Sequence, residues 1–387
     1  MSRPTWLPVP PDSDFPIENL PFGIARLEDG SPRVVTRLGD HVLDLGAVGI
    51  APDLTTRPTL NALMESGRGA EVRADAAEIL TGPERLDAVR ALSDVDVLLP
   101  VRVGDYVDFY SSIHHATNLG HIFRPDGEAL PPNWRHIPIA YHGRAGTVVV
   151  SGTRIARPAG VVPSPADGVP RLAPTSALDF ELEVAFVVGG RNASRVRPDD
   201  AGAHVFGVVL CNDWSARDIQ RFEYQPLGPN LGKSFATTIS PWVVTLDALR
   251  PYLVAPPMQD PEPEPYLRAT KPWALDLHLE VDRNGATITS TNFAATYWTF
   301  AQQLAHMTVN GATTRSGDVF ASGTVSGPTP GERGSLIEQL ADGTAGTYLA
   351  DGDTVTLRGW CGGGASDRPR IGFGEASGTV VATLEEV

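Results

Sequence analysis

One short segment places three carboxylates at alternate positions among apolar residues. It is DFELEVAF, in which Asp179, Glu181 and Glu183 carry the acids. Alternate side chains of a β-strand point to one face, so the segment predicts a strand with all three acids on one side. Carboxylates crowded together in a partly buried place raise one another's pKa unless a cation neutralises them. The segment therefore indicates a metal site, and a solvated strand face is the alternative.

The kind of metal follows from the ligand atoms. Oxygen ligands without a nearby Cys or His cluster favour Mg²⁺, Ca²⁺ or Mn²⁺ over zinc. The two cysteines, Cys211 and Cys361, lie far apart and belong to no paired spacing. We expect them to be buried reduced thiols.

A second segment, residues 104–118, is dense in groups that ligate metals or move protons (GDYVDFYSSIHHATN). Asp108 could supply a further metal ligand. His115 is the best candidate for a general base, because imidazole titrates near neutral pH. Neighbouring histidines point apart, so only one of His114 and His115 is expected to serve. A structural histidine is the alternative.

A third segment runs from Asn212 to Gln220 and is followed by GPNLGKS at residues 228–234. If the chain is helical after Asp213, Arg217 and Gln220 share a face. The GKS ending suggests a phosphate-binding loop, but its two glycines enclose three residues instead of four and no apolar strand precedes it. A lysine beside Arg217 and Gln220 suits a substrate carboxylate or a developing oxyanion instead.

Lysine is rare in this chain. Only Lys233 and Lys271 occur among the 31 basic residues. A lysine that persists where arginine is otherwise used marks a position that needs a compact ammonium, with chance retention as the alternative.

Other enzyme classes find little support. A serine hydrolase would need Gly-x-Ser-x-Gly, and the nearest segment, GTVSG at residues 323–327, is mis-spaced. The glycine run at residues 362–364 indicates a loop, so we expect no organic cofactor.

The elements that must position these residues are mostly short strands. Apolar runs in residues 22–45, broken by turn residues, are typical of a β-meander. Residues 60–92 predict two short amphipathic helices, the second with Leu86, Val89 and Leu92 on one face. We place a domain boundary near residue 100, which divides the chain into residues 1–100 and 101–387. The larger part predicts one clear helix and six strands, at residues 296–307 for the helix and 147–151, 180–188, 205–210, 242–246, 275–281 and 354–359 for the strands.

The composition and length of the chain restrict its architecture, partners and location. A chain of 387 residues exceeds the usual size of one hydrophobic core, and 39 Gly and 34 Pro favour a β-rich architecture with many turns. A formal charge of −15 argues against nucleic acid and anionic membranes as partners. The chain has no run of eighteen apolar residues, and its start lacks the apolar core of a signal peptide. We therefore expect a cytoplasmic protein.

Taken in order, several segments resemble the fumarylacetoacetase family. They are GDYVDFYSSIHHATNLG, PNWRHIPIAYHGRAGTVVVSGT, LDFELEVAF, NDWSARDIQRFEYQPLGPNLGKSFATTISPWVV, YWTFAQQLAHMTVNG and ASGTVSGP. The resemblance implies a mainly β fold, with a small SH3-like N-terminal β-barrel and a large C-terminal mixed β-roll. It also implies a homodimer that hydrolyses 4-fumarylacetoacetate to fumarate and acetoacetate, the last step of tyrosine and phenylalanine catabolism.

The resemblance also implies roles for individual residues. The family's metal ligands match Asp108, Glu181, Glu183 and Asp213, and a second, magnesium position would use Lys233 and Thr237. Its water-activating histidine matches His115, oriented by Glu338, and Arg217, Gln220 and Lys233 would stabilise the oxyanion. Further substrate contacts match Tyr110, Arg124, Tyr141, Tyr224 and Thr324.

Two alternative functions remain compatible with the sequence. One is a related reaction of the same superfamily, such as acylpyruvate hydrolysis, oxaloacetate decarboxylation or 2-keto-enoate hydration. The other is a catalytically silent β-roll that binds a cation and a partner.

Overall fold

The computed structural model describes residues 4–364 and 366–383. The expectation about a signal peptide falls partly on Met1 to Arg3, which lie outside the described residues. Within the described part of the chain, no helix combines the length and apolar character needed to cross a membrane.

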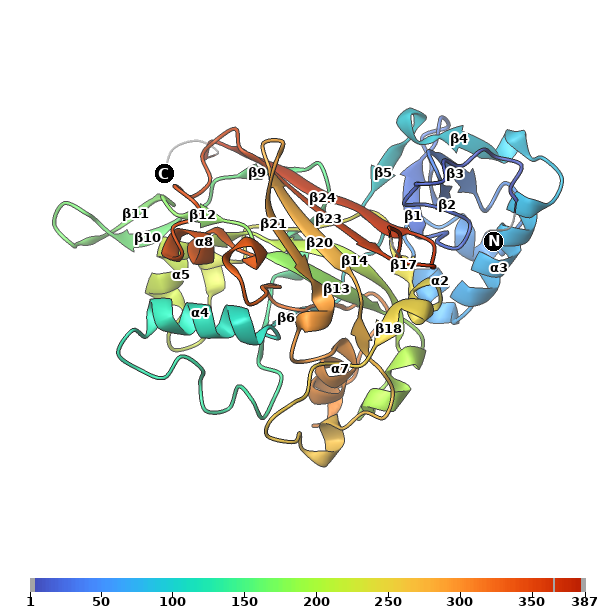
Figure 1. Ribbon diagram of the computed structural model, residues 1–387. Coiled ribbons are helices and arrows are strands. Elements are labelled where there is room, and N and C mark those ends of the chain that lie inside the picture. The colour runs from blue at the N-terminus through green and yellow to red at the C-terminus, as the bar shows by residue number, and fades with distance from the viewer. Residues whose placement is uncertain (1–3, 365, 384–387) are drawn as a thin grey trace.

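The N-terminal part is a curled antiparallel sheet with helices beside it (Figure 1). The strand order is β4-β3-β2-β1-β5, with β1 (Phe22–Arg26), β2 (Pro32–Leu38), β3 (His41–Asp44), β4 (Val89–Ala91) and β5 (Asp96–Leu98). The helices are α1 (Pro52–Thr55), α2 (Asn61–Ser66) and α3 (Gly69–Thr81). The predicted meander is confirmed.

The predicted second helix, over residues 86–92, is wrong. Leu86–Ala88 forms a single 3-10 turn and the next residues form β4, which pairs with β3. A segment this short gains little from helical hydrogen bonds alone, so pairing along the sheet edge decides its structure. Leu86 is exposed, which removes the apolar face that the prediction required.

The larger part is built on a mixed eight-stranded sheet. Its order is β7-β6-β22-β13-β14-β16-β8, and β17 also pairs with β14. The strands are β6 (Tyr106–Phe109), β7 (Ala140–His142), β8 (Val148–Val150), β13 (Leu182–Val188), β14 (Val205–Asp213), β16 (Thr237–Ile239), β17 (Val244–Thr245) and β22 (Val319–Ala321). The central strands β13 and β14 are buried along most of their length, which explains their nearly continuous apolar sequence.

A second sheet packs against the first through a shared apolar core. Its order is β21-β20-β23-β24-β9, formed by β9 (Arg154–Ala156), β20 (His278–Arg283), β21 (Ala286–Asn292), β23 (Thr354–Cys361) and β24 (Ile371–Val381). Three small strand pairs complete the fold: β10 (Ala159–Pro163) with β11 (Pro170–Pro174), β12 (Leu178–Asp179) with β15 (Ser215–Ala216), and β18 (Leu253–Val254) with β19 (Ala274–Leu275). The predicted mainly β fold, with a small N-terminal β-barrel and a large mixed β-roll, is confirmed, and the N-terminal part is a curled half-barrel of five strands in the order β4-β3-β2-β1-β5.

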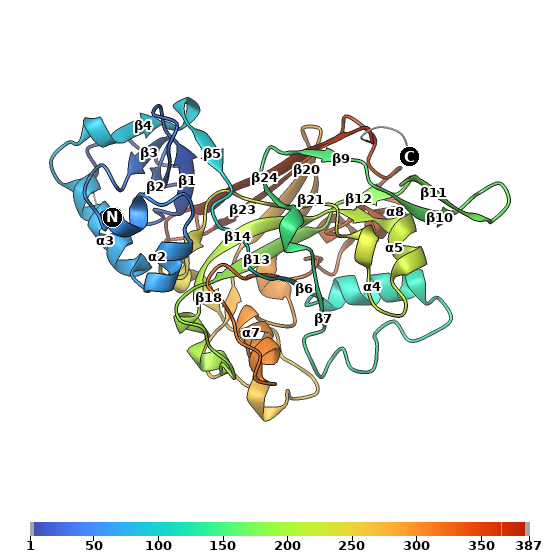
Figure 2. The same ribbon diagram turned by 180° about the vertical axis from the view of Figure 1, so that it is seen from behind.

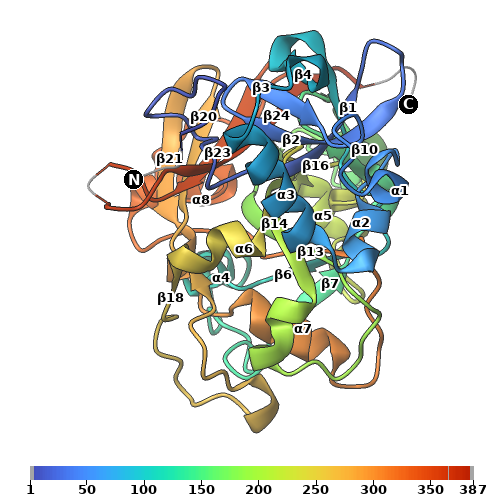
Figure 3. The ribbon, with the colours of Figure 1, turned by 90° about the vertical axis from the view of Figure 1, so that its right-hand side faces the viewer.

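Helices surround one end of the large sheet. Figure 2 shows α4 (Ile113–Phe123) close to α5 (Arg217–Glu223), with α8 (Leu336–Ala341) near them, while α7 (Phe300–Thr308) lies apart. The remaining helix, α6 (Leu246–Leu249), lies on the side of the N-terminal part (Figure 3). The prediction named only one clear helix in this region, whereas the structure has several. In α4 the apolar residues Ile113, Ala116, Leu119 and Phe123 do recur at helical spacing, so this helix could have been predicted.

The predicted helix over residues 296–307 exists, but it begins later, at Phe300. Thr299 caps its first turn and forms a reciprocal capping box with Gln302, which fixes the start. The division of the chain near residue 100 stays a prediction. α2 and α3 share one apolar cluster with the large sheet, in which Leu63 and Met64 lie with Val187 and Val209.

Candidate active site and metal centre

Four carboxylates converge where neighbouring strands of the large sheet meet. Asp108 lies on β6, Glu183 on β13 and Asp213 at the end of β14, with Glu181 just before β13. All four are buried, and one ligand atom from each lies within 4.8 Å of the others. The structure thus brings together the four residues predicted as metal ligands, and the cluster could hold a metal ion.

Asp179, the third acid of the predicted strand, does not belong to this cluster. Asp179 belongs to β12, and the ladder is interrupted at Phe180 before β13 begins. Its carboxylate accepts hydrogen bonds from Arg217 Nε at 2.8 Å and from the backbone N–H groups of Leu336 and Ile337 at 2.7 and 3.0 Å. Because the interruption redirects the chain, Asp179 anchors Arg217 and the start of α8 instead of joining the cluster.

Two of the four carboxylates are paired with cations. Glu181 accepts from Arg217 Nη1 at 2.7 Å and also contacts the Lys233 ammonium. Asp213 accepts from Lys233 at 2.7 Å, from Thr237 at 2.9 Å and from the Tyr141 hydroxyl at 2.8 Å. Burial opposes ionisation of Glu181, but the charges of Lys233 and Arg217 outweigh burial and lower its pKa.

The other two carboxylates have no such cation. Asp108 Oδ1 and Glu183 Oε1 are buried and accept no hydrogen bond from the described part of the chain. The Gly323 N–H donates to the second oxygen of Glu183 at 3.1 Å. Burial raises the pKa of both groups, and neighbouring carboxylates raise it further. Unpaired oxygens from two adjacent acids are what a divalent cation would satisfy, so the residues fit the predicted metal.

Replacing Asp108 with asparagine is expected to weaken binding of Ca²⁺, Mg²⁺ or Mn²⁺ by at least about 10²-fold. The amide keeps the shape but loses the anionic oxygen, and changes in outer partners of metal ligands already cost about 10 to 100-fold. Isothermal titration calorimetry on metal-stripped protein measures the effect. Asp105 is an exposed carboxylate three residues earlier, so Asp105→Asn is the matched control. Equal affinity in both variants would remove Asp108 from the metal site.

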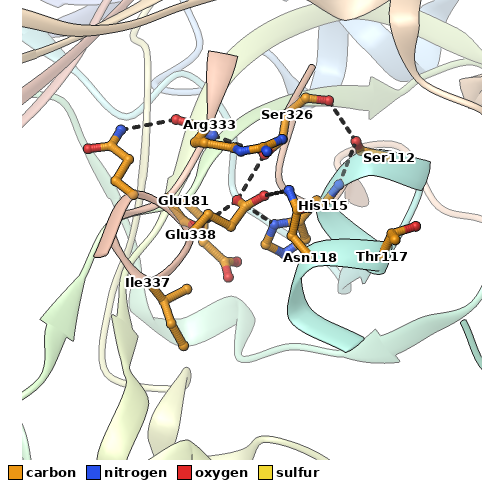
Figure 4. Close-up of polar contacts among 12 residues, drawn as sticks. Ser112, His115, Thr117, Asn118, Glu181, Ser326, Arg333, Ile337 and Glu338 are labelled. Atoms are coloured by element: carbon orange, nitrogen blue, oxygen red, sulfur yellow. Dashed lines mark hydrogen bonds and ion pairs between the residues drawn. The ribbon is translucent and has the colours of Figure 1, made fainter. Parts of the chain in front are cut away.

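The candidate general base is held by a carboxylate from another helix. His115 on α4 contacts Glu338 on α8, with 2.7 Å between Nδ1 and Oε2, and both residues are buried (Figure 4). Burial would raise the pKa of Glu338, but His115 and the other donors around it outweigh burial and lower it to about 2. Glu338 is thus a fixed anion that orients the imidazole. His114 lies outside the cavity lining, as expected for two neighbouring histidines.

A cavity of about 310 Å³ adjoins the acidic cluster. Its wall includes Asp108, Glu181 and His115 together with every other predicted catalytic or substrate-contacting residue except Glu338, which lies behind His115. These are Tyr110, Arg124, Tyr141, Arg217, Gln220, Tyr224, Lys233 and Thr324.

The cavity offers donors that have no partner. Arg217 Nη2 and Thr324 Oγ1 are buried and form no hydrogen bond with the described residues. Arg217 Nη1 also donates to Gln220 at 3.1 Å, as the shared helix face predicted. Buried donors without acceptors cost free energy, so an anionic or carbonyl oxygen of a ligand would suit them.

Sequence reasoning missed several residues of this site. The apolar wall of the cavity is formed by Phe109, Leu119, Phe123 and Ile139. The residues that hold Glu338 besides His115 are Asn118, Ser326 and Ser335. Asn118 follows His115 by three residues, so a helical reading of residues 113–123 would have placed both on one face.

Comparison with known proteins gives a consistent result over nearly the whole chain. Residues 18–104 match the family described as fumarylacetoacetase N-terminal, and residues 106–381 match fumarylacetoacetate (FAA) hydrolase C-terminal. A fumarylacetoacetase of Caenorhabditis elegans is 45% identical, covering 97% of this chain and 99% of the relative. The Homo sapiens fumarylacetoacetase is 44% identical, covering 98% and 99%.

Solved structures share the fold at lower identity. A fumarylacetoacetate hydrolase from Exiguobacterium antarcticum superposes with a TM-score of 0.60 at 20% identity, covering 94% of this chain and 99% of that one. A 2-hydroxyhepta-2,4-diene-1,7-dioate isomerase from Mycobacterium marinum gives 0.54 at 18% identity, covering 95% and 100%. Since a hydrolase and an isomerase share this fold, the fold alone does not select the reaction.

Proposed function

Because this chain belongs to the fumarylacetoacetate hydrolase family, we propose that it hydrolyses 4-fumarylacetoacetate to fumarate and acetoacetate, the last step of tyrosine and phenylalanine breakdown. The observation that carries the proposal is the arrangement of one cavity. Its wall combines an acidic cluster that could hold a metal, a histidine oriented by a buried carboxylate, and unpaired donors from Arg217 and Thr324. Water addition to a metal-polarised carbonyl, followed by cleavage of the carbon-carbon bond, would use all three.

His115 acts as the general base in this proposal. Glu338 is ionised and can only accept, so the hydrogen on His115 must lie on Nδ1. Nε2 is then left with a lone pair that can take a proton from water. The charge of Glu338 also stabilises the imidazolium that forms.

Arg217, Gln220 and Lys233 stabilise the oxyanion that develops when water adds to the substrate carbonyl. Arg217 is held at Nε by Asp179, and its Nη2 forms no hydrogen bond with the described residues, so this nitrogen is available as a donor. Tyr110, Arg124, Tyr141, Tyr224 and Thr324 would contact the rest of the substrate. Burial raises the pKa of Tyr110 and of Tyr141, so both phenols stay protonated as donors.

Asp108, Glu181, Glu183 and Asp213 would hold Ca²⁺ or Mg²⁺, with Mn²⁺ as a further possibility. A divalent cation bound there supplies Lewis-acid polarisation and makes the enolate fragment a better leaving group. The second cation position that the family resemblance assigns to Lys233 and Thr237 would lie beside Asp213, which both residues contact, and no organic cofactor is proposed.

Metal affinity should fall as the pH is lowered. Asp108 and Glu183 have raised pKa values without metal, so they hold protons that an incoming cation must displace. Metal binding should therefore release protons, and titration calorimetry in two buffers of different ionisation enthalpy measures their number. Glu183→Gln should release fewer protons than the unchanged protein. A proton release of zero at every pH would contradict the prediction.

A substrate panel separates the proposal from its rivals. Turnover of fumarylacetoacetate should exceed that of an acylpyruvate, of oxaloacetate and of a 2-keto-enoate. Preference for one of the latter three would assign the chain to another reaction of the same fold. Metal binding without turnover of any compound would favour the silent binding module.

We further propose a cytoplasmic homodimer whose partner molecules are small diketo acids rather than nucleic acids or membranes. The acidic charge of −15 supports the exclusion of polyanionic partners. Light scattering after size-exclusion chromatography tests the oligomeric state, and a monomer at all concentrations would contradict it.

A further inference from the structure

Glu338 accepts more hydrogen bonds than orientation of His115 requires. Besides His115, its carboxylate accepts from Asn118 Nδ2 at 2.8 Å, from Ser326 Oγ at 2.9 Å and from Ser335 Oγ at 2.7 Å (Figure 4). Glu338 is 1% exposed, so water does not compete with these donors. The four donors come from α4, from the segment before α8 and from the loop after β22.

The direction of these hydrogen bonds is fixed by their surroundings. The backbone N–H of Gly334 donates to Ser326 Oγ at 2.9 Å, which leaves the Ser326 hydroxyl hydrogen for Glu338. An ionised carboxylate has no hydrogen to give, so Asn118 must present its NH₂ group. Glu338 is therefore an acceptor towards all its partners, in keeping with its low pKa.

The two oxygens of Glu338 are not equivalent. Oε2 accepts from His115, Ser326 and Ser335, whereas Oε1 accepts from Asn118. His115 and Asn118 are three residues apart on α4, so one helix face contacts both oxygens of one carboxylate. Rotation of the carboxylate about its last side-chain bond would break both contacts together.

We propose that Asn118 is a positioning residue for the general base: by holding Glu338 Oε1 it keeps Oε2 on His115 Nδ1 and so keeps the basic lone pair on Nε2. Asn118 acts through Glu338 and touches neither substrate nor metal in this account. The inference rests on the proposed hydrolysis, in which His115 activates water.

The same helix offers a matched control. Thr117 precedes Asn118, donates its hydroxyl to the Ile113 carbonyl at 2.7 Å and points away from Glu338 in Figure 4. Both residues are half-buried on α4, so a substitution at either position could weaken the helix to a similar extent. Only the substitution of Asn118 also removes the contact to Glu338.

The test compares Asn118→Ala, Asn118→Asp and Thr117→Val. We expect kcat for fumarylacetoacetate to fall about 10-fold to 10²-fold in Asn118→Ala, the effect of one lost hydrogen bond to a charged group. KM and metal affinity should stay unchanged, and Thr117→Val should keep near-normal kcat. Asn118→Asp should lose more than the alanine variant, because it places a second carboxylate against Glu338. It is nearly isosteric and serves as the second variant should Asn118→Ala not fold.

A spectroscopic measurement distinguishes a role of Asn118 in orienting His115 from a role in folding alone. Imidazole ¹⁵N chemical shifts, assigned to His115 by comparison with His115→Asn, report which ring nitrogen carries the hydrogen. The unchanged protein should show the Nδ1–H form, and Asn118→Ala should show an increased share of the Nε2–H form. Unchanged kcat and tautomer in a folded Asn118 variant, or equal losses in Thr117→Val, would overturn the inference. If the unchanged protein does not hydrolyse fumarylacetoacetate, the proposed function fails, while the tautomer measurement still decides the role of Asn118.

Discussion

Replacing His115 with alanine should lower kcat by about 10² to 10⁴-fold, the usual contribution of general acid–base catalysis. The imidazole lines the cavity beside Glu181, and Glu338 holds it at 2.7 Å from behind. Removing it leaves the proposed metal ligands and the oxyanion donors in place. The loss should therefore appear in kcat, with metal affinity and folding unchanged.

His114→Ala is the matched control for this substitution. It removes the same side chain one position earlier, where the ring does not line the cavity. Steady-state kinetics, circular dichroism and metal titration on both variants provide the measurement. Most of the turnover surviving in His115→Ala, or an equal loss in His114→Ala, would take His115 out of the mechanism.

Lys233→Arg should lower kcat by about 10² to 10³-fold although it conserves charge. Lys233 is 6% exposed, and its ammonium contacts both Glu181 and Asp213 while lining the cavity. A planar guanidinium is larger and cannot take the place of a compact point charge between two proposed metal ligands. It would displace substrate, Arg217 or a ligand, and losing one donor to an oxyanion typically costs about this much.

The other lysine gives the control. Lys271 lies on the surface, where its ammonium donates to the Asp199 carbonyl at 2.6 Å. Lys271→Arg should therefore keep normal turnover, as the arginine-rich composition of the chain suggests. If Lys233→Arg retains normal kcat while Lys271→Arg does not, Lys233 has no special place in the site.

Much of the site could be predicted from local sequence. The alternation of acids in DFELEVAF gave Glu181 and Glu183, because strand period alone sets which side chains share a face. The same reasoning does not explain why Asp179 lies outside the cluster, since an interruption at Phe180 cannot be recognised without the neighbouring strands. Asp108 was proposed as a further ligand from its own segment, whereas Asp213 and Glu338 lie in distant segments and were assigned through the resemblance to a family.

The missed features depend on tertiary contacts. The helix predicted over residues 86–92 became a strand because an edge of the N-terminal sheet was available for pairing. α4 was not predicted, although its apolar residues recur at helical spacing and Ser112 caps its start by accepting from the His115 N–H. Helical spacing would have placed Asn118 on one face with His115, but its contact with Glu338 depends on α4 and α8 meeting in the fold.

Metal-dependent hydrolysis by this protein can be measured as fumarate release from fumarylacetoacetate. Purified protein would be stripped of metal with a chelator, assayed, and assayed again after addition of Ca²⁺ or Mg²⁺. We expect little turnover in the stripped protein and recovery with the added ion, with fumarate and acetoacetate formed in equal amounts. Full turnover after verified metal removal, or no fumarate release from the metal-loaded protein, would contradict this expectation.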